Sequence, residues 1–410
     1  MISRILFMSM ILLLIDLMAF QAVRHMLESS GKTLRNIVYI TYWLVPVITI
    51  VYLLGLSYGW NATLPKALQV IIRAMIFILY FAKLLMAAII LVDDIRRLVF
   101  GALNISIEKM NLSTVRSTWM SYTALFLGAI PILSLTYGMA RNPYRYKLVK
   151  SKVPIKDLHP ALKGLRIVQI SDIHSGSFLF KEPVERSIQM INDAKPDIVF
   201  FTGDLVNTMA KEMEPFIDMF SRIQAPLGVF SVLGNHDYGD YHQWPSQADK
   251  QRNFEDLKNI HKQLGWRLLL NEHERIQIGE TYFNVIGVEN YSASPRFPKH
   301  GDLQLATQGM DKDTFNILLS HDPSHWNSQV TKDYPEIDLT LSGHTHGFQF
   351  GVEIPGFIKW SPVQYVYPQW AGLYKESHQH LYVNRGLGYL GYPGRVGILP
   401  EITLLELDQL

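Results

Sequence analysis

Five short segments in the second part of the chain combine side chains that commonly bind metal ions. They are DIH at 172–174, GD at 203–204, GNHD at 234–237, SHD at 320–322 and GHTH at 343–346. Carboxylate, imidazole and amide oxygen ligands suit divalent ions such as Mn, Fe or Zn. Any one of these segments could be a cap, a turn or a buried polar group. Five of them in succession indicate a metal-dependent catalytic centre.

Each segment directly follows a short apolar run, and the runs are 166–170, 198–202, 229–233, 317–320 and 339–342. Runs that are apolar throughout are typical of strands covered on both faces of a sheet. Amphipathic stretches between the first three, 182–194 and 211–223, predict crossover helices. Ligand sites in open α/β sheets form beyond the carboxyl ends of the strands. We therefore expect the five polar segments to meet at one point.

The order of these motifs resembles that of the calcineurin-like metallophosphoesterases, which is DxH, GD, GNH[DE], H and GHxH. The resemblance runs from 165 to about 407. It implies an α/β sandwich of two mixed sheets flanked by helices, with two bound divalent ions. The tail segments AGLY, VNRGLG and PEITLLEL are similar to a membrane-associated or exported bacterial phosphodiesterase-like branch of that family. Phe348 departs from this branch, which often has Gly there.

The resemblance also implies a role for each motif residue. One ion would be held by Asp172, His174, Asp204 and His346, and the other by Asp204, Asn235, His321 and His344. His236 would be the general acid near the leaving group. The position that often carries its Asp partner in the family holds Asn207, which can accept a hydrogen bond but cannot stabilise a cation by charge. Asp237 is expected either to orient the ligands or His236, or to be an ordinary turn carboxylate.

The expected chemistry follows from two adjacent cations. They lower the pKa of a bridging water enough to supply hydroxide near neutral pH, and hydroxide attacks phosphorus in line. His236 then protonates the departing oxygen. Arg385 and Arg395 lie in the Gly-rich tail, where they could grip a phosphate or diphosphate group or form structural salt bridges.

The first third of the chain contains four long apolar runs, at 5–23, 37–58, 68–92 and 119–139. Each is close to the ~20 residues that a helix needs to cross a bilayer. The sequence thus predicts a transmembrane region at 1–140, a linker at 141–164 and the metallophosphoesterase domain at 165–410. The lipid bilayer is the expected partner of the first region.

Composition supports this division. Charged residues are only 18% of the 410 residues and hydrophobic residues are 48%. A net charge of +2 and the lack of a basic stripe argue against a nucleic-acid partner. The chain has no Cys, which excludes thiolate zinc sites and cysteine catalysis.

Basic residues in the loops suggest an orientation. The loops 21–36 and 93–118 share one side of the membrane and contain seven Lys or Arg residues, whereas the opposite side has Arg4 and Lys66. The positive-inside rule therefore favours cytoplasmic loops and an extracytoplasmic catalytic domain. Including the basic residues of 141–152 makes the two sides equal.

Two further features have alternative interpretations. Asp16, Arg73 and Lys83 lie inside apolar runs; Asp16 and Lys83 could pair, but snorkelling to the surface is the favoured interpretation. The segment 357–374, with Trp360, Tyr365, Tyr367 and Trp370, could lie at the lipid interface, cover the site or pack in the core.

These observations predict an integral, multi-pass membrane protein. Its expected activity is hydrolysis of a phosphate ester or diphosphate of a lipid-linked substrate. Two alternatives stay open: a cytoplasm-facing nucleotide-diphospho-lipid pyrophosphohydrolase, and a non-catalytic membrane scaffold or sensor. The intact ligand set favours an enzyme over a scaffold. Nothing in the sequence indicates the oligomeric state.

Overall fold

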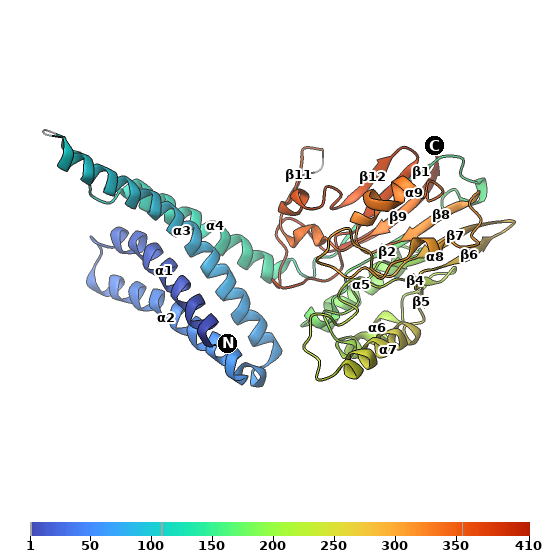
Figure 1. The fold of residues 1–410 in the computed structure, drawn as a ribbon, viewed down its shortest axis with the longest axis horizontal. Helices are drawn as coiled ribbons and strands as arrows, with labels where there is room; N and C mark the ends of the chain where they lie inside the picture. Colours follow the sequence, from blue (N-terminus) through green and yellow to red (C-terminus); the bar gives the residue numbers. More distant parts are fainter. Residues whose placement is uncertain (1, 108–109, 355) are drawn as a thin grey trace. The chain divides into compact units, whose positions relative to one another are not determined.

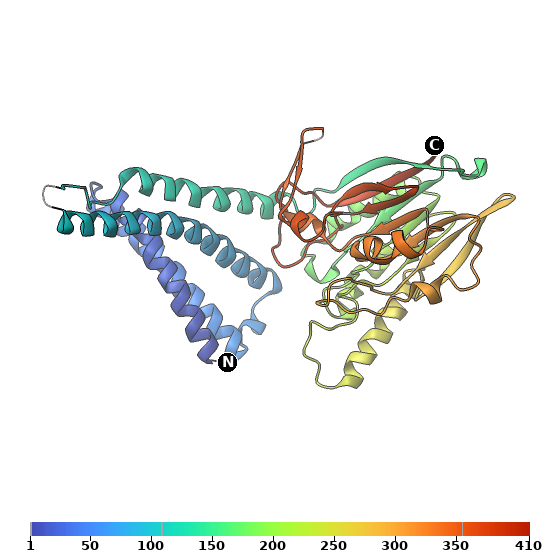
Figure 2. The ribbon, with the colours of Figure 1, turned by 45° about the horizontal axis from the view of Figure 1, so that its top comes forward.

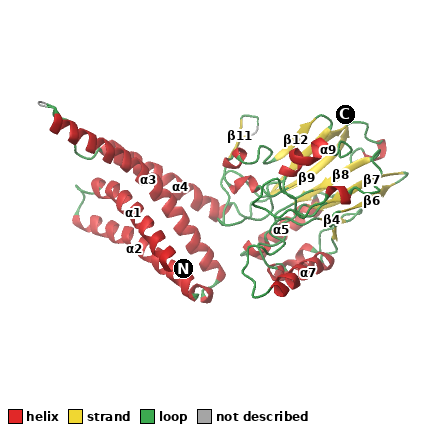
Figure 3. Cartoon of the chain, viewed as in Figure 1, coloured by secondary structure: helices red, strands yellow, loops and turns green. Residues whose placement is uncertain are grey.

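The structure is a computed structural model that describes residues 2–107, 110–354 and 356–410. The chain divides into two compact units, Met1–Tyr137 and Gly138–Leu410. The first is helical and the second combines strands with helices, as the secondary-structure colours of Figure 3 show. We refer to them as the helical unit and the α/β unit and describe each by itself.

The helical unit is built from long apolar helices. They are α1 (Ile2–Met26), α2 (Lys32–Tyr58), α3 (Lys66–Ser106) and α4 (Thr118–Arg141), the last of which ends in the α/β unit. Among the described residues, these four are long and apolar enough to cross a membrane. Large apolar side chains such as Leu6, Ile40 and Leu133 point outward, as lipid-facing residues do. The four predicted spans are confirmed as helices.

Helix α3 is much longer than the predicted run at 68–92, because it continues for 41 residues to Ser106. The charged residues that end the apolar run do not end the helix. Asp93 accepts hydrogen bonds from Arg96 Nε at 2.9 Å and from Arg116 Nη1 at 3.3 Å. Asp94 lies 2.7 Å from Arg116 Nη2. Both carboxylates are thus paired within the continuing helix.

A polar cluster lies inside the helical unit. Lys83 Nζ donates to Asp16 Oδ1 at 2.5 Å, and Tyr80 donates to Asp16 Oδ2 at 2.8 Å. Asp16 is fully buried. The favoured snorkelling interpretation is therefore wrong for Asp16 and Lys83, which pair inside the bundle because pairing removes an isolated charge from an apolar region. Arg73 instead bonds to the Gln69 carbonyl of its own helix.

The α/β unit contains two main sheets and a separate hairpin (Figures 1 and 2). In the described part of the chain, the first sheet has six strands in the order β1-β14-β2-β3-β4-β5 and the second has six in the order β12-β13-β9-β8-β7-β6. Their bounds are β1 Lys147–Ile155, β2 Arg166–Ile170, β3 Ile198–Phe201, β4 Val229–Ser231, β5 Arg267–Leu268, β6 Glu272–Ile278, β7 Thr281–Gly287, β8 Phe315–Leu319, β9 Leu339–Ser342, β12 Gly372–Glu376, β13 Gln379–Val383 and β14 Glu401–Gln409. Both sheets are mixed, because β14 is antiparallel to β2, β6 to β7, and β12 to β13.

Three layers of apolar contacts hold this unit together. Between the sheets lies a core that includes Phe200, Val285 and Leu341. A second core covers the outer face of the first sheet and includes residues of α5 (Lys181–Asp193) and α7 (Gln247–Gln263). A third covers the outer face of the second sheet near α8 (Leu303–Ala306) and α9 (Thr331–Asp333). The predicted sandwich of two mixed sheets flanked by helices is confirmed.

The five predicted strands are present, but two other segments differ from expectation. The stretch 211–223 is not one helix: it consists of short 3-10 turns at Ala210–Glu212 and Glu214–Phe216 followed by α6 (Ile217–Phe220). Pro215 lacks a backbone N–H and interrupts a continuous helix. The expected linker at 141–164 contains β1, which pairs in parallel with β14 and so belongs to the first sheet.

Candidate active site

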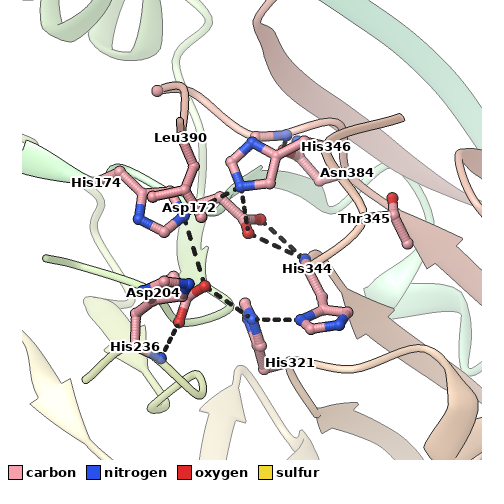
Figure 4. Close-up of polar contacts among 12 residues, drawn as sticks. Asp172, His174, Asp204, His236, His321, His344, Thr345, His346, Asn384 and Leu390 are labelled. Atoms are coloured by element: carbon pink, nitrogen blue, oxygen red, sulfur yellow. Dashed lines mark hydrogen bonds and ion pairs between the residues drawn. The ribbon is translucent and has the colours of Figure 1, made fainter. Parts of the chain in front are cut away.

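The five polar motifs lie at the carboxyl ends of β2, β3, β4, β8 and β9 and converge on one site, as predicted (Figure 4). Three of these strands come from the first sheet and two from the second. The site therefore forms where the ends of both sheets meet.

One set of side chains gathers around His346. Its Nε2 atom lies 3.2 Å from Asp172 Oδ1 and 3.0 Å from His174 Nε2. His174 Nε2 is also 3.5 Å from Asp204 Oδ2. These four residues are those that the family resemblance assigns to one ion.

A second set surrounds His344. Its Nδ1 atom lies 2.9 Å from Asn235 Oδ1 and 3.3 Å from His321 Nε2. His321 Nε2 is 3.2 Å from Asp204 Oδ2. The same carboxylate oxygen of Asp204 thus contacts both sets. Asp172 also lies centrally: its ligand atoms are within 4.8 Å of those of His174 and His346, and of those of Asp204 and His321.

The donor set fits divalent cations. Asp172, His174 and His321 are fully buried, so their polar atoms need partners inside the protein. Two neutral imidazoles that face each other through Nε2 can share only one hydrogen. In addition, the buried Nδ1 of His174 has no hydrogen-bond partner among the described residues. Carboxylates, imidazoles and one amide oxygen are suitable ligands for Mn, Fe or Zn.

His321 illustrates the electrostatic demand for a cation. Its Nδ1 donates to the Thr202 carbonyl at 2.7 Å, which directs Nε2 toward the carboxylates. Burial lowers the pKa of His321, but the charges of Asp204 and Asp172 outweigh burial and raise that pKa to about 10. Burial instead lowers the pKa of His174 well below its ordinary value. The carboxylates therefore attract positive charge, which a metal ion can supply in place of a proton.

The backbone at the site is held in an unusual conformation. Left-handed φ angles occur at Asp172 (50°), His174 (45°), Asp204 (60°), His344 (71°) and His346 (50°). Such angles are uncommon outside Gly, and they cluster at functional sites where the fold compensates for the strain. Two glycines permit the close approach: a Cβ atom would lie 2.2 Å from Asp204 Oδ1 at Gly234 and 1.9 Å from Ser171 Oγ at Gly343.

His236 is half-buried and lies beside the first set, where its ring packs edge-on against that of His174 with centroids 4.9 Å apart. Its backbone N–H donates to Asp204 Oδ1 at 2.9 Å, and its Nδ1 lies 2.7 Å from the main-chain carbonyl of Asn207. The Asn207 side chain points elsewhere and donates to Ser177 Oγ at 3.0 Å. Asn207 therefore contacts His236 through its backbone, which any residue at that position could provide. Tyr241 packs over the imidazole with ring centroids 4.4 Å apart.

Asp237 ties two motif loops together. Its carboxylate accepts backbone hydrogen bonds from Asp204, Leu205 and Gly234, each at 2.9 Å. Burial and the neighbouring charge of Asp204 raise the pKa of Asp237 to about 7. Of the two interpretations, the structure favours orientation of the ligand loops over an ordinary turn carboxylate.

The two tail arginines are engaged in the protein. Arg385 forms ion pairs with Glu401 and, at 2.5 Å, with Glu353. Arg395 is fully buried and donates through Nη2 to the carbonyl of Gly386 at 3.1 Å. That Nη2 atom also lies 3.4 Å from His346 Nδ1. Both arginines hold the Gly-rich loop in place behind the ligands.

Sequence reasoning missed a polar chain on the far side of His344. Tyr367 Oη lies 2.9 Å from His344 Nε2 and donates to Asp322 Oδ2 at 3.2 Å. The Phe297 ring packs edge-on against the His344 ring, with their centroids 4.7 Å apart. Asp322 belongs to the SHD segment singled out in the sequence, but no spacing in the sequence connects Tyr367 with the site.

Two family models match the chain. Residues 165–348 match a model described as "Calcineurin-like phosphoesterase". Residues 3–143 match one described as "Probable Calcineurin-like phosphoesterase, transmembrane domain".

Two curated relatives are named as metallophosphoesterases, and one of them also as a transmembrane protein. The "Transmembrane protein with metallophosphoesterase domain" of Danio rerio is 32% identical over 323 residues, covering 76% of this chain and 69% of the relative. The "Uncharacterized metallophosphoesterase YkuE" of Bacillus subtilis is 30% identical over 288 residues, covering 68% of this chain and 94% of the relative. The chain therefore belongs to the calcineurin-like metallophosphoesterases, as an integral membrane protein that carries a metal-dependent phosphoester hydrolase domain.

Proposed function

We propose that this membrane-anchored enzyme hydrolyses a phosphate ester or diphosphate of a lipid-linked substrate with the help of two divalent ions. The observation that carries the proposal is the position of Asp204 Oδ2, 3.5 Å from His174 Nε2 and 3.2 Å from His321 Nε2. One carboxylate oxygen shared by two ligand sets is what a two-metal site requires.

The residues divide the work as follows. Asp172, His174 and His346 hold one ion, Asn235, His321 and His344 hold the other, and Asp204 is shared. When bound, two such ions supply an activated water and neutralise negative charge on the phosphoryl oxygens. Because Nδ1 of His236 is bonded to a carbonyl at 2.7 Å, its Nε2 is the nitrogen that can pass a proton to the leaving oxygen.

The membrane anchor supports the lipid part of the proposal. A hydrolase with its own bilayer-spanning helices stays at the surface where lipid-linked substrates are found. The basic loops 21–36 and 93–118 support a catalytic domain on the extracytoplasmic side. The alternative, a nucleotide-diphospho-lipid hydrolase facing the cytoplasm, differs in product: it releases a nucleotide.

The test compares variants of the full chain in lipid nanodiscs with Mn present. Substrates are lipid phosphates, nucleotide-diphospho-lipids and a soluble diester, bis(p-nitrophenyl) phosphate. We expect Asp204→Asn to lower turnover more than about 100-fold, because loss of a ligand exceeds the 10- to 100-fold cost of losing a supporting residue. The matched control is Asp218→Asn, which changes an exposed carboxylate.

Two results would contradict the proposal. One is full turnover by Asp204→Asn. The other is a wild-type protein that hydrolyses none of these substrates and contains no metal by elemental analysis, which would favour the scaffold.

A further inference from the structure

The α/β unit exposes a concentration of large apolar side chains on one segment, 348–366. The exposed fractions are Phe348 61%, Val352 43%, Ile354 51%, Phe357 86%, Ile358 39%, Tyr365 78% and Val366 72%. Most of these residues belong to a two-stranded hairpin, β10 (Val352–Ile354) and β11 (Ile358–Trp360), and to the following 3-10 turn η8 (Pro362–Tyr365). The hairpin projects from the rest of the unit (Figures 1 and 2). Exposed apolar surface of this kind marks a site of interaction.

The segment is attached firmly at its base. Ser361 Oγ donates to the Gly347 carbonyl at 2.9 Å. Farther along, Trp370 is only 3% exposed, and its carbonyl accepts a hydrogen bond from Thr345 Oγ1 at 2.7 Å. Trp370 thus packs in the core, whereas the apolar side chains of the hairpin stay outside it. Since the base is fixed, the exposed tip is presented in a defined direction.

The same base is joined to the end of the last membrane helix through one loop, 392–396. On one side, Gly351 N–H donates to the Val396 carbonyl at 2.9 Å. On the other, Asn142 Nδ2 donates to the Arg395 carbonyl at 2.8 Å, and Arg395 N–H donates to the Gly138 carbonyl at 3.3 Å. All of these residues lie within the α/β unit. The apolar hairpin therefore starts next to the point where α4 ends.

The position of the hairpin beside the end of α4 indicates which partner its apolar side chains contact. Helix α4 is long and apolar enough to cross a bilayer, so its end at Arg141 lies near a membrane surface. Aromatic residues with an apolar body and a polar tip, such as Tyr365 and Trp360, are favoured at that surface. A lipid interface is thus the apolar environment closest to the exposed hairpin.

The segment also leads to the ligands. Tyr367 lies two residues after the end of η8, and its hydroxyl lies 2.9 Å from His344 Nε2. The 3-10 turn of the exposed apolar segment is therefore followed, two residues later, by a side chain that contacts the second ligand set.

We propose that the β10–β11 hairpin and η8 dip into the lipid interface on the side where α4 ends, and that they direct the phosphate of a lipid in that leaflet to the active site. The membrane contact is independent of the catalytic assignment. Delivery of a lipid phosphate rests on the proposed function.

The first experiment measures membrane contact. The chain has no Cys, so Phe357→Cys introduces a unique site for a bimane fluorophore. The matched control is Glu280→Cys, at the exposed polar turn between β6 and β7. Each full-length variant is reconstituted into phosphatidylcholine vesicles with nitroxide-labelled acyl chains. We expect strong quenching at 357 and little at 280; equal quenching at both, or none at 357, overturns the membrane contact.

The second experiment measures delivery. Phe357→Asp places a charge at the tip, and Leu305→Asp does so at a residue that is 53% exposed but lies in α8. We expect Phe357→Asp to lower turnover of a bilayer lipid phosphate about tenfold, with hydrolysis of bis(p-nitrophenyl) phosphate unchanged, and Leu305→Asp to change neither. Equal lipid turnover in Phe357→Asp and wild type, or equal loss on both substrates, overturns delivery. A wild-type protein inactive on both substrates contradicts the proposed function, while the quenching result still decides membrane contact.

Discussion

The Nε2 atoms of His174 and His346 face each other at 3.0 Å inside the protein. Asp172 Oδ1 lies 3.2 Å from the second of these atoms. Nitrogen lone pairs and carboxylate oxygens that converge in this way repel one another unless positive charge lies between them. The stability of the α/β unit should therefore depend on a cation bound between these side chains.

We therefore expect a chelator to lower the unfolding temperature of the protein and added Mn or Zn to restore it. A ligand at 100 times its dissociation constant stabilises the folded state by about 2.7 kcal/mol. The measurement is tryptophan fluorescence during heating, with metal content determined in parallel. His174→Ala should respond less to the chelator than wild type. An unchanged unfolding temperature after complete metal removal from wild type would argue against the site.

His236 and Asn207 should differ sharply on substitution. His236→Ala is expected to lower kcat about 100-fold or more for an alkyl phosphodiester, because the alkoxide is a poor leaving group that needs the proton supplied by His236 Nε2. Hydrolysis of a p-nitrophenyl ester should fall less, since that leaving group needs no proton. Asn207→Ala should stay within about threefold of wild type, because its contact with His236 uses the main-chain carbonyl. A severe loss in Asn207→Ala would show that its side chain matters.

Tyr367 should support His344. Tyr367→Phe removes the hydroxyl that lies 2.9 Å from His344 Nε2 and donates to Asp322. Loss of such a supporting group typically costs 10- to 100-fold in metal affinity or activity, so we expect a higher Mn concentration for half-maximal turnover. Tyr365→Phe is the matched control, because that side chain is 78% exposed. Equal metal titrations for the two variants would exclude the supporting role.

Asp338, which is not one of the metal-ligand candidates, should make the stability of the protein depend on pH. Burial raises the pKa of Asp338 from 3.8 to about 6 in the folded protein. Because a raised pKa favours the protonated form, its stabilising contribution is complete below about pH 4 and is lost as the pH rises to about 6. Two pKa units correspond to at most about 3 kcal/mol.

Substitution by Asn removes this titration and keeps an acceptor for the Asn316 N–H, which Asp338 now binds at 2.9 Å. Asp338→Asn should thus raise the unfolding temperature more at pH 7.5 than at pH 4.5. The control Asp218→Asn changes an exposed carboxylate. The same gain at both pH values would contradict the assignment.

The convergence of the five motifs was predictable because each follows its strand within a few residues. Apolar runs such as 198–202 identify buried parallel strands, and the carboxyl ends of such strands meet at one edge. This rule alone predicts that Asp172 and Asp204 lie close together, because they follow adjacent parallel strands.

Other features depend on contacts between distant residues. Asp16 and Lys83 are 67 positions apart, and no local pattern distinguishes a buried pair from two snorkelling side chains. Tyr367 lies in an irregular loop, and no periodic pattern predicts that this loop brings its hydroxyl to His344. The strand β1 was not predicted because Lys147, Lys150 and Lys152 break up its apolar residues without a regular alternation, and a basic stretch after a membrane helix resembles a linker.

The place of β14 in the first sheet affects how the protein can be made. It lies between β1 and β2, although it follows every other strand along the chain. While a ribosome is still translating residues 166–400, β1 has already been synthesised next to the last membrane helix and has no partner. The first sheet can be completed only after Glu401–Gln409 have left the ribosome and β14 has paired with β1 and β2. A nascent chain that stops early would therefore be held in the membrane by its inserted helices with two strand edges unpaired, a ready target for quality-control proteases.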